Sequence, residues 1–148
     1  MTTIEKQLAE LAAREAIREL PQRYCDCVWR DDVDGLANLF TADASFITVI
    51  GEINMTVSGR DNIRDMFAKA LNIQPRPYIH NHVFDLVADG FASGRAYLDL
   101  RSARNNMEFL GAGYYEDEYM ATPEGWKFHT RKFTALRMDE LPDGLVDD

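Results

Sequence analysis

The sequence lacks long apolar runs and has few basic residues. Lysine and arginine number 16 against 25 aspartates and glutamates, which gives a net charge of -9 at pH 7. Nucleic acids and anionic membrane surfaces attract basic proteins, so this balance argues against both as partners. No apolar run reaches the length of about 18 residues that a spanning helix needs. The N-terminal residues also lack the apolar segment of a signal peptide, so a cytoplasmic location is expected.

Cysteine is scarce, and familiar cofactor motifs are missing. Cys25 and Cys27 lie two positions apart. Each helical residue turns by about 100°, so on a helix these two side chains point in nearly opposite directions. We expect neither a disulfide nor a shared metal ion. The glycine-rich signatures of phosphate and dinucleotide sites and the Ser-His-Asp pattern are absent from the sequence, and no cofactor is predicted.

The first half of the chain has a mainly helical pattern. With 148 residues, 46% of them hydrophobic, the chain can form one domain with its own core. A long helix is expected from about residue 2, kinked or broken at Pro21, and continuing to Arg30. A short helix follows over about 32–40. A third begins after Ser58-Gly-Arg-Asp61 and ends before the Pro75-Arg-Pro77 segment.

The second half has the pattern of a β-meander. A strand over 45–50 and a short return strand over 55–57 precede four longer strands, predicted over 78–88, 91–101, 107–121 and 126–138. Helices followed by a curved antiparallel sheet is an α+β order. Such a sheet wrapped around a long helix forms a cone whose mouth suits a small molecule. Residues 1–138 are predicted to form this single domain, and 139–148 an acidic, loosely ordered tail.

The stretch from Tyr24 to Phe46 carries a family resemblance. Its pattern Y-x7-D-x-D-G-L-x-x-L-F-x-x-D-A resembles the opening of the NTF2-like superfamily, especially the SnoaL-like and scytalone-dehydratase-like branch and the steroid delta-isomerases. The resemblance extends more weakly over almost the whole chain and implies a cone-shaped α+β fold. It also implies a homodimer, in agreement with a sheet whose outer face the few helices cannot cover. The fold hosts isomerases, dehydratases and ring-hydroxylating dioxygenase β subunits, so it does not fix a reaction.

Tyr24 is the first candidate catalytic residue. A tyrosine at this position in related isomerases and dehydratases donates a hydrogen bond to a substrate oxygen, and a phenol in a dry pocket can stabilise an enolate. The alternative is a core tyrosine with a local partner. Trp29 stands where many relatives carry an aspartate, and it can only shape the pocket or offer an indole N–H. Asp26, Asp31 and Asp32 are nearby carboxylates that could replace it or serve as solvated and capping residues.

Thr48 is a second departure from the family pattern. It lies near the general-base aspartate of steroid isomerases, and threonine has no usable base at neutral pH. The usual steroid-isomerase mechanism is therefore not expected, and Thr48 is predicted to contact substrate instead.

Two histidines lie on the predicted strand over 78–88. Strand alternation places His80, His82 and Phe84 on one face, where both imidazoles could serve as acid–base groups and Phe84 as an apolar wall. Dehydratase-like relatives often show H-x-x-x-N before this strand. If Asn81 is that asparagine, Pro77 occupies the histidine position, and His80 or His82 is a relocated base. The alternative is that one or both histidines are structural or exposed, and no third metal ligand accompanies them.

Arg131 lies in Trp126-Lys-Phe-His-Thr-Arg, which resembles the W-x-[IF]-x-x-R ending of the family's last strand. In some relatives an arginine near this position faces the pocket and helps a leaving anion. The alternative is a salt bridge on the outer face of the sheet, for which Glu116 and Glu118 on the neighbouring strand are possible partners. His129, two residues earlier, is expected on the same face as Arg131.

Two functions are consistent with these residues. The first is a cofactor-free lyase or isomerase acting by acid–base chemistry on a small hydrophobic, oxygenated ring compound. Tyr24, His80, His82 and Arg131 would carry the chemistry, while Trp29, Thr48 and Phe84 would contact the substrate. The second is a non-catalytic module, either a small-ligand binder or a structural subunit resembling dioxygenase β subunits.

Overall fold

The computed structural model of the protein describes residues 1–145. Its helices are α1 (Thr3–Trp29), α2 (Val33–Ala37) and α3 (Arg60–Ala70), with 3-10 turns η1 (Leu71–Ile73) and η2 (Ala103–Asn105). Its strands are β1 (Phe40–Ile50), β2 (Ile53–Ser58), β3 (Pro75–Ala88), β4 (Phe91–Ser102), β5 (Glu108–Thr122) and β6 (Gly125–Met138). The α+β class and the order of the elements are confirmed. The strand predicted to begin at residue 45 begins earlier, at Phe40.

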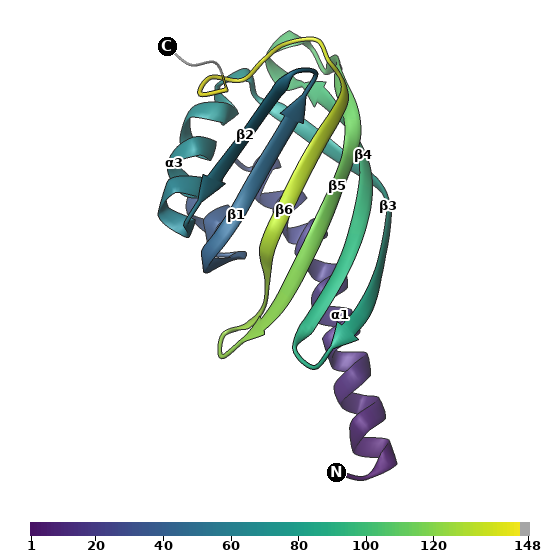
Figure 1. Ribbon diagram of the computed structural model, residues 1–148. Helices are drawn as coiled ribbons and strands as arrows, with labels where there is room; N and C mark the ends of the chain where they lie inside the picture. The colour runs from purple at the N-terminus through teal and green to yellow at the C-terminus, as the bar shows by residue number, and fades with distance from the viewer. Residues whose placement is uncertain (146–148) are drawn as a thin grey trace.

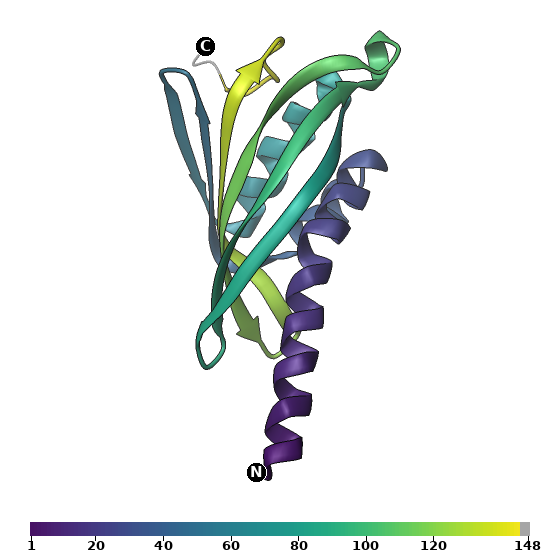
Figure 2. The same ribbon diagram turned by 90° about the vertical axis from the view of Figure 1, so that its right-hand side faces the viewer.

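The six strands form one curved sheet in the order β2-β1-β6-β5-β4-β3. Neighbouring strands are antiparallel except for the central pair, β1 and β6, which run parallel. Figures 1 and 2 show the long strands bending around a concave face. At Gly113 a Cβ atom would collide with the Thr134 carbonyl, so only glycine permits the close approach of β5 and β6 there.

Helix α1 lies along the concave side of the sheet and packs against β3 and β6. A capping box of Thr2 and Glu5 begins it, and the helix continues through Pro21 without interruption. Its second half buries an apolar face, whereas Ile4, Leu8 and Leu11 are exposed on the part that extends past the sheet (Figure 1). Among the helices of residues 1–145, none is long and apolar enough to cross a membrane.

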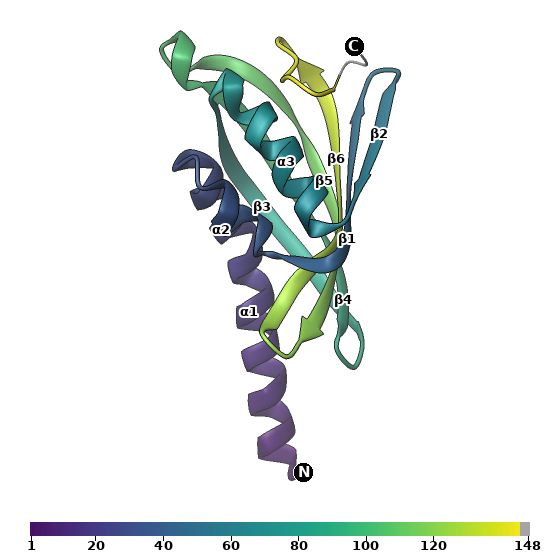
Figure 3. The same ribbon diagram turned by 90° about the vertical axis from the view of Figure 1, so that its left-hand side faces the viewer.

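The other two helices complete the concave side. Figure 3 shows α2 beside α1 and α3 next to β1 and β2. Asp32 caps α2, its side chain accepting from the Gly35 N–H at 2.9 Å. Ile63 and Phe67 of α3 are buried against the sheet. The core between helices and sheet therefore opens into a cone toward the end where α3 lies.

A segment after β6, residues 139–145, crosses this open end and is here called the C-terminal strap. The Asp139 N–H donates to the Leu110 carbonyl at 2.8 Å, and the Asp143 N–H donates to Asn72 Oδ1 at 3.2 Å. Leu145 is only 9% exposed. This packing differs from the loose ordering expected of the tail, because Pro142 and Leu145 add apolar surface to the cone. Residues 146–148 of the predicted tail lie outside the described residues.

Candidate functional site

An apolar cavity of about 90 Å³ lies between the concave face of the sheet, α3 and the C-terminal strap. Its walls come from every part of the fold: Tyr24 and Val28 of α1, Met66 and Phe67 of α3, Phe46 of β1, Pro77 of β3, Tyr115 of β5, Phe133 of β6 and Leu145 of the strap. No histidine, carboxylate or basic side chain is among the described residues that line it. The cavity is therefore built to exclude water rather than to hold charge.

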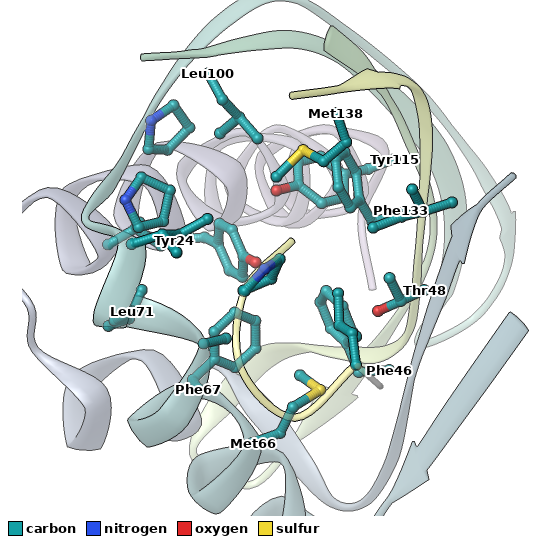
Figure 4. Close-up of a pocket in the computed structure, with 18 residues that line it drawn as sticks. Tyr24, Phe46, Thr48, Met66, Phe67, Leu71, Leu100, Tyr115, Phe133 and Met138 are labelled. Carbon is teal, nitrogen blue, oxygen red and sulfur yellow. The ribbon is translucent and has the colours of Figure 1, made fainter. Parts of the chain in front are cut away.

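Three hydroxyl groups provide side-chain polarity in the cavity wall. Figure 4 shows the oxygens of Tyr24 and Tyr115 on one side and that of Thr48 on another, all turned toward the interior. Burial raises the pKa of both tyrosines, and the two lie close enough to shift each other's pKa. Both phenols are therefore protonated at neutral pH. They can each donate a hydrogen bond to an oxygen atom in the cavity.

Behind these tyrosines lies a fully buried cation. The Arg131 guanidinium carbon lies 3.5 Å from the ring centroid of Tyr115, 4.2 Å from that of Tyr24 and 4.5 Å from that of Phe128. Within residues 1–145 its three guanidinium nitrogens find no hydrogen-bond partner. Its counter-ion is Asp117, whose Oδ2 lies 3.5 Å from Nη1, with both side chains fully buried. Aromatic faces and one carboxylate thus hold Arg131 in place of a hydrogen-bonded shell.

A polar chain continues from Asp117 away from the cavity. The Tyr119 hydroxyl donates to Asp117 Oδ2 at 3.0 Å, and its oxygen lies 2.9 Å from Nε2 of His82. A phenol has one proton, so while Asp117 is ionised the His82 Nε2 must be the donor to Tyr119. The neutral imidazole then has its unprotonated nitrogen, Nδ1, free. His82 itself lines a shallow groove between α1 and β3, together with Arg18 and Gln22.

The electrostatics of this chain follow from its burial. Burial raises the pKa of Asp117 to about 6, although Arg131 and the Tyr119 hydrogen bond act in the opposite direction. Burial, together with the positive charges of Arg131 and Arg18, lowers the pKa of His82 to about 4. At neutral pH the chain therefore consists of a neutral imidazole, a neutral phenol, a carboxylate and a guanidinium.

The prediction that His80 and His82 share a face is wrong. The pairing of β3 with β4 shifts by one residue between Ile79 and Asn81, so His80 is the extra residue of a β-bulge. A bulge reverses the alternation of side chains that follow it. His80 consequently pairs with Asp99 at 2.8 Å with its side chain 61% exposed, while His82 faces inward. His80 is therefore absent from the cavity wall, although it borders the same shallow groove as His82.

A second bulge overturns the expectation for His129. The pairing of β5 with β6 shifts between Glu118 and Tyr119, opposite His129. Phe128 and Arg131 therefore both face inward, whereas His129 contacts the Thr41 hydroxyl at 3.1 Å near the edge of the sheet. The outer-face salt bridge considered for Arg131 is likewise not observed, because its side chain is fully buried.

Trp29 and Phe84 both lie outside the cavity wall. The Trp29 indole N–H donates to the Pro77 carbonyl at 2.8 Å, and its ring packs edge-on against Tyr78 at 5.5 Å. Phe84 stacks on His82 at 5.3 Å, with the Arg18 guanidinium carbon 5.1 Å from its ring centroid. Of the seven predicted site residues, Tyr24 and Thr48 line the cavity and Arg131 lies directly behind it.

The three aspartates considered as substitutes for the family carboxylate also lie outside the cavity wall. Asp26 and Asp31 pair with Arg30 and Arg76, at 3.5 and 3.3 Å, and Asp32 caps α2. The carboxylate that does enter the core, Asp117, was missed. Its signal was the alternation Tyr115-x-Asp117-x-Tyr119, which places one acid between two aromatic residues on a single face of β5.

A curved sheet wrapped around α1 and enclosing an apolar cavity defines an NTF2-like, or cystatin-like, α+β protein. Residues 9–132 match the SnoaL-like domain family, and the chain belongs to that family. No curated protein matches the chain.

Solved structures share the fold. An NTF2-like protein with a cystatin-like fold from Novosphingobium aromaticivorans has a TM-score of 0.79 and 19% identity, covering 100% of this chain and 97% of its own. A proposed scytalone dehydratase from that organism has a TM-score of 0.69 and 17% identity, covering 98% and 100%. The β subunit of a proposed aromatic-ring-hydroxylating dioxygenase, also from that organism, has a TM-score of 0.73 and 20% identity, covering 88% and 93%. At these identities the likeness concerns the fold alone.

Proposed function

We propose that the protein binds a small hydrophobic ring compound carrying an oxygen atom, which the Tyr24 and Tyr115 hydroxyls hold in place. The composition of the cavity wall carries this proposal, because it is apolar except for buried hydroxyl groups. A bound oxygen would accept from the phenol hydroxyls, which in this structure interact with each other. The apolar ring of the ligand would fill the rest of the cavity and contribute most of the affinity.

The size of the cavity supports a single ring. Its volume of about 90 Å³ is below the range of about 300–1,000 Å³ that holds drug-sized ligands. A dry protein cavity of about 150 Å³ is known to admit benzene. Met66 and Met138 line the wall here, and their flexible side chains can move to give the additional space. Beyond Asp139, whose N–H donates to Leu110 of β5, the strap can also move without breaking hydrogen bonds to the sheet.

A matched pair of substitutions on α3 tests ligand binding. Ala70 lines the cavity, whereas Ala68 is exposed on the same helix. A panel of phenol, cyclohexanone, benzene and cyclohexane would be titrated by NMR against the wild type, Ala70→Phe and Ala68→Phe. We expect phenol and cyclohexanone to shift resonances of cavity residues, Ala70→Phe to abolish these shifts and Ala68→Phe to keep them. Equal shifts in both variants would contradict the proposal.

A lyase or isomerase is a second candidate, favoured by one observation. Two phenols that donate to one oxygen are suited to polarising a carbonyl and stabilising its enolate. None of the described residues that line the cavity can act as a general base. Pro77 lines the cavity at the position where the family resemblance implies a histidine. Such a reaction would therefore rely on a basic group of the substrate. Deuterium exchange α to the carbonyl of a bound cyclohexanone that carries a basic amino substituent, followed in wild type and Tyr24→Phe, tests it: no exchange above buffer removes this candidate.

We further propose that the protein is a homodimer in the cytoplasm. Val83, Tyr97 and Leu136 are exposed large apolar residues of the sheet, with exposures of 39%, 42% and 76%. Self-association would remove such surface from water. Sedimentation equilibrium would show a mass near twice 16.9 kDa if this is correct, and a monomer mass at micromolar concentration would refute it.

A further inference from the structure

Arg131 places a positive charge against the rings of the two tyrosines whose hydroxyl groups face the cavity. Its guanidinium carbon lies 3.5 Å from the ring of Tyr115 and 4.2 Å from that of Tyr24, and the whole side chain is buried. These are the two tyrosines that line the cavity. The cation is therefore in contact with both phenol rings that would hold a ligand oxygen.

A cation against the face of a phenol changes what its hydroxyl prefers to bind. It attracts the ring's electrons, which makes the O–H a stronger donor and stabilises negative charge on its partner. An arginine remains charged at any ordinary pH, and its field is only weakly screened in a buried site. The same cation lowers the pKa of both tyrosines against the larger effect of burial.

The opposing charge is Asp117, and its position matters. Its Oδ2 lies 3.5 Å from Arg131 Nη1, and it receives the Tyr119 hydrogen bond. Asp117 is absent from the cavity wall, whereas both tyrosines belong to it. The positive end of the ion pair thus lies against the cavity tyrosines, while the negative end accepts a hydrogen bond from Tyr119, whose hydroxyl in turn contacts His82.

We propose that the cavity selects ligands whose oxygen is acidic, namely phenols and enols, over neutral ketones and ethers of the same shape, and that Arg131 sets this preference. The ligand binds as its anion, its O–H proton leaves to solvent, and both tyrosines stay protonated and donate to the oxyanion. This inference rests on the proposed ligand-binding function and names its ligand class. Arg131 acts through Tyr24 and Tyr115 as a positioning and electrostatic residue, without contact to the ligand.

The test uses 4-nitrophenol, whose absorption spectrum distinguishes phenol from phenolate, with nitrobenzene as the neutral probe of the same shape. Wild-type protein at saturating 4-nitrophenol would be titrated with pH. We expect the pKa of the bound probe to lie about one unit or more below that of the free probe. A purely apolar cavity would instead raise it, because burial disfavours the anion.

Variants then assign the effect. Asp117→Asn removes the opposing negative charge and should lower the pKa of the bound probe further. Arg131→Met combined with Asp117→Asn removes both charges. This double variant should bring the pKa of the bound probe to or above the pKa of the free probe. Arg18→Met is the matched control, because Arg18 lies over the ring of Phe84, outside the cavity wall, and should leave it unchanged. Circular dichroism would confirm that each variant is folded.

The outcomes separate the two proposals. If wild-type protein binds neither nitrobenzene nor 4-nitrophenol, ligand binding itself fails. If both bind but the pKa of bound 4-nitrophenol is unchanged or raised, ligand binding stands and the role of Arg131 is refuted. A lowered value that Asp117→Asn leaves unaltered also refutes it, and this holds even if the double variant does not fold.

Discussion

The inside of the cone has two regions that differ in chemistry. The region under α3 is a cavity whose polar side-chain groups are hydroxyls, and the region under α1 contains the chain from His82 through Tyr119 to Asp117. Arg131 separates them, with aromatic rings on one side and a carboxylate on the other. Space for a ligand and acid–base groups are therefore not in the same place. A histidine inside such a fold is weak support for proton transfer unless it also lines the cavity.

The largest expected effect comes from breaking the boundary between the two regions. Arg131→Met leaves the buried Asp117 carboxylate without its counter-ion, which should lower the free energy of unfolding by about 3–5 kcal/mol. Urea denaturation would measure it. Arg137→Met is the control, because its pair with Asp139 is exposed and its loss should have a much smaller effect. Equal losses in the two variants would mean that the buried pair has no special role.

A second test uses pH to separate the two ends of the polar chain. The pKa of Asp117 is raised to about 6 in the folded protein, so the folded state binds more protons than the unfolded state between about pH 4 and 6. Its contribution is present below pH 4 and falls as pH rises to 6, by at most roughly 3 kcal/mol. The pKa of His82 is lowered to about 4, so its contribution increases with pH over the same window.

The Asp117 and His82 contributions change the free energy of unfolding in opposite directions as pH rises, so they should partly cancel in the wild type. His82→Gln removes the histidine contribution, and we expect its unfolding free energy to fall between pH 4 and 6 relative to wild type. Asp117→Asn should show a rise over that range. Urea denaturation at four or five pH values would measure both slopes, and parallel profiles for the two variants would contradict the assignment.

Ligand affinity should distinguish the regions directly. Tyr24→Phe and Tyr115→Phe each remove a donor from the cavity, which should weaken binding of phenol about tenfold. His82→Gln alters a side chain outside the cavity wall and should change the affinity less than twofold. Isothermal titration calorimetry would give the three dissociation constants. A tenfold loss in His82→Gln would show that the polar chain takes part in binding after all.

The smallest effect is expected at the strap. Leu145 lines the cavity, whereas Leu141 belongs to the same strap but is 39% exposed and absent from the wall. Leu145→Ala should increase the rate of ligand dissociation a few-fold, because it weakens the apolar contact that holds the strap. Leu141→Ala should not. Stopped-flow displacement would measure both rates, and the same rate in the two variants would argue against a role for the strap.

The sequence predicts the elements well and the site less well. Turn signals and alternating patterns place β3 to β6 within a few residues, because strand periodicity survives local irregularity. The bulges at His80 and His129 leave no mark in the strand's composition or alternation. Each bulge nevertheless adds one unpaired residue to its strand, so the side chains that follow switch from one face of the sheet to the other. Two of the three histidines were therefore placed on the wrong face.

The remaining errors have a different cause. Tyr24 could be assigned because helix α1 has a regular period and a family pattern begins there. Asp117 was missed because an acidic residue in a strand is expected to be exposed unless a buried partner is known. Its partner, Arg131, belongs to the next strand, β6. The strap was underestimated because its acidic residues outnumber Pro142 and Leu145, the two that contact the cavity.

The strap also bears on how this protein could diversify. It completes a wall of the cavity through Pro142 and Leu145, whereas its hydrogen bonds and ion pairs are made by Asp139, Glu140 and Asp143. Substitutions there change the space available to a ligand while the sheet and α1 keep their packing. Selection for a new ligand size can therefore act on a handful of positions near the end of the chain. It can do so without the loss of folding stability that changes in the aromatic core around Arg131 would bring.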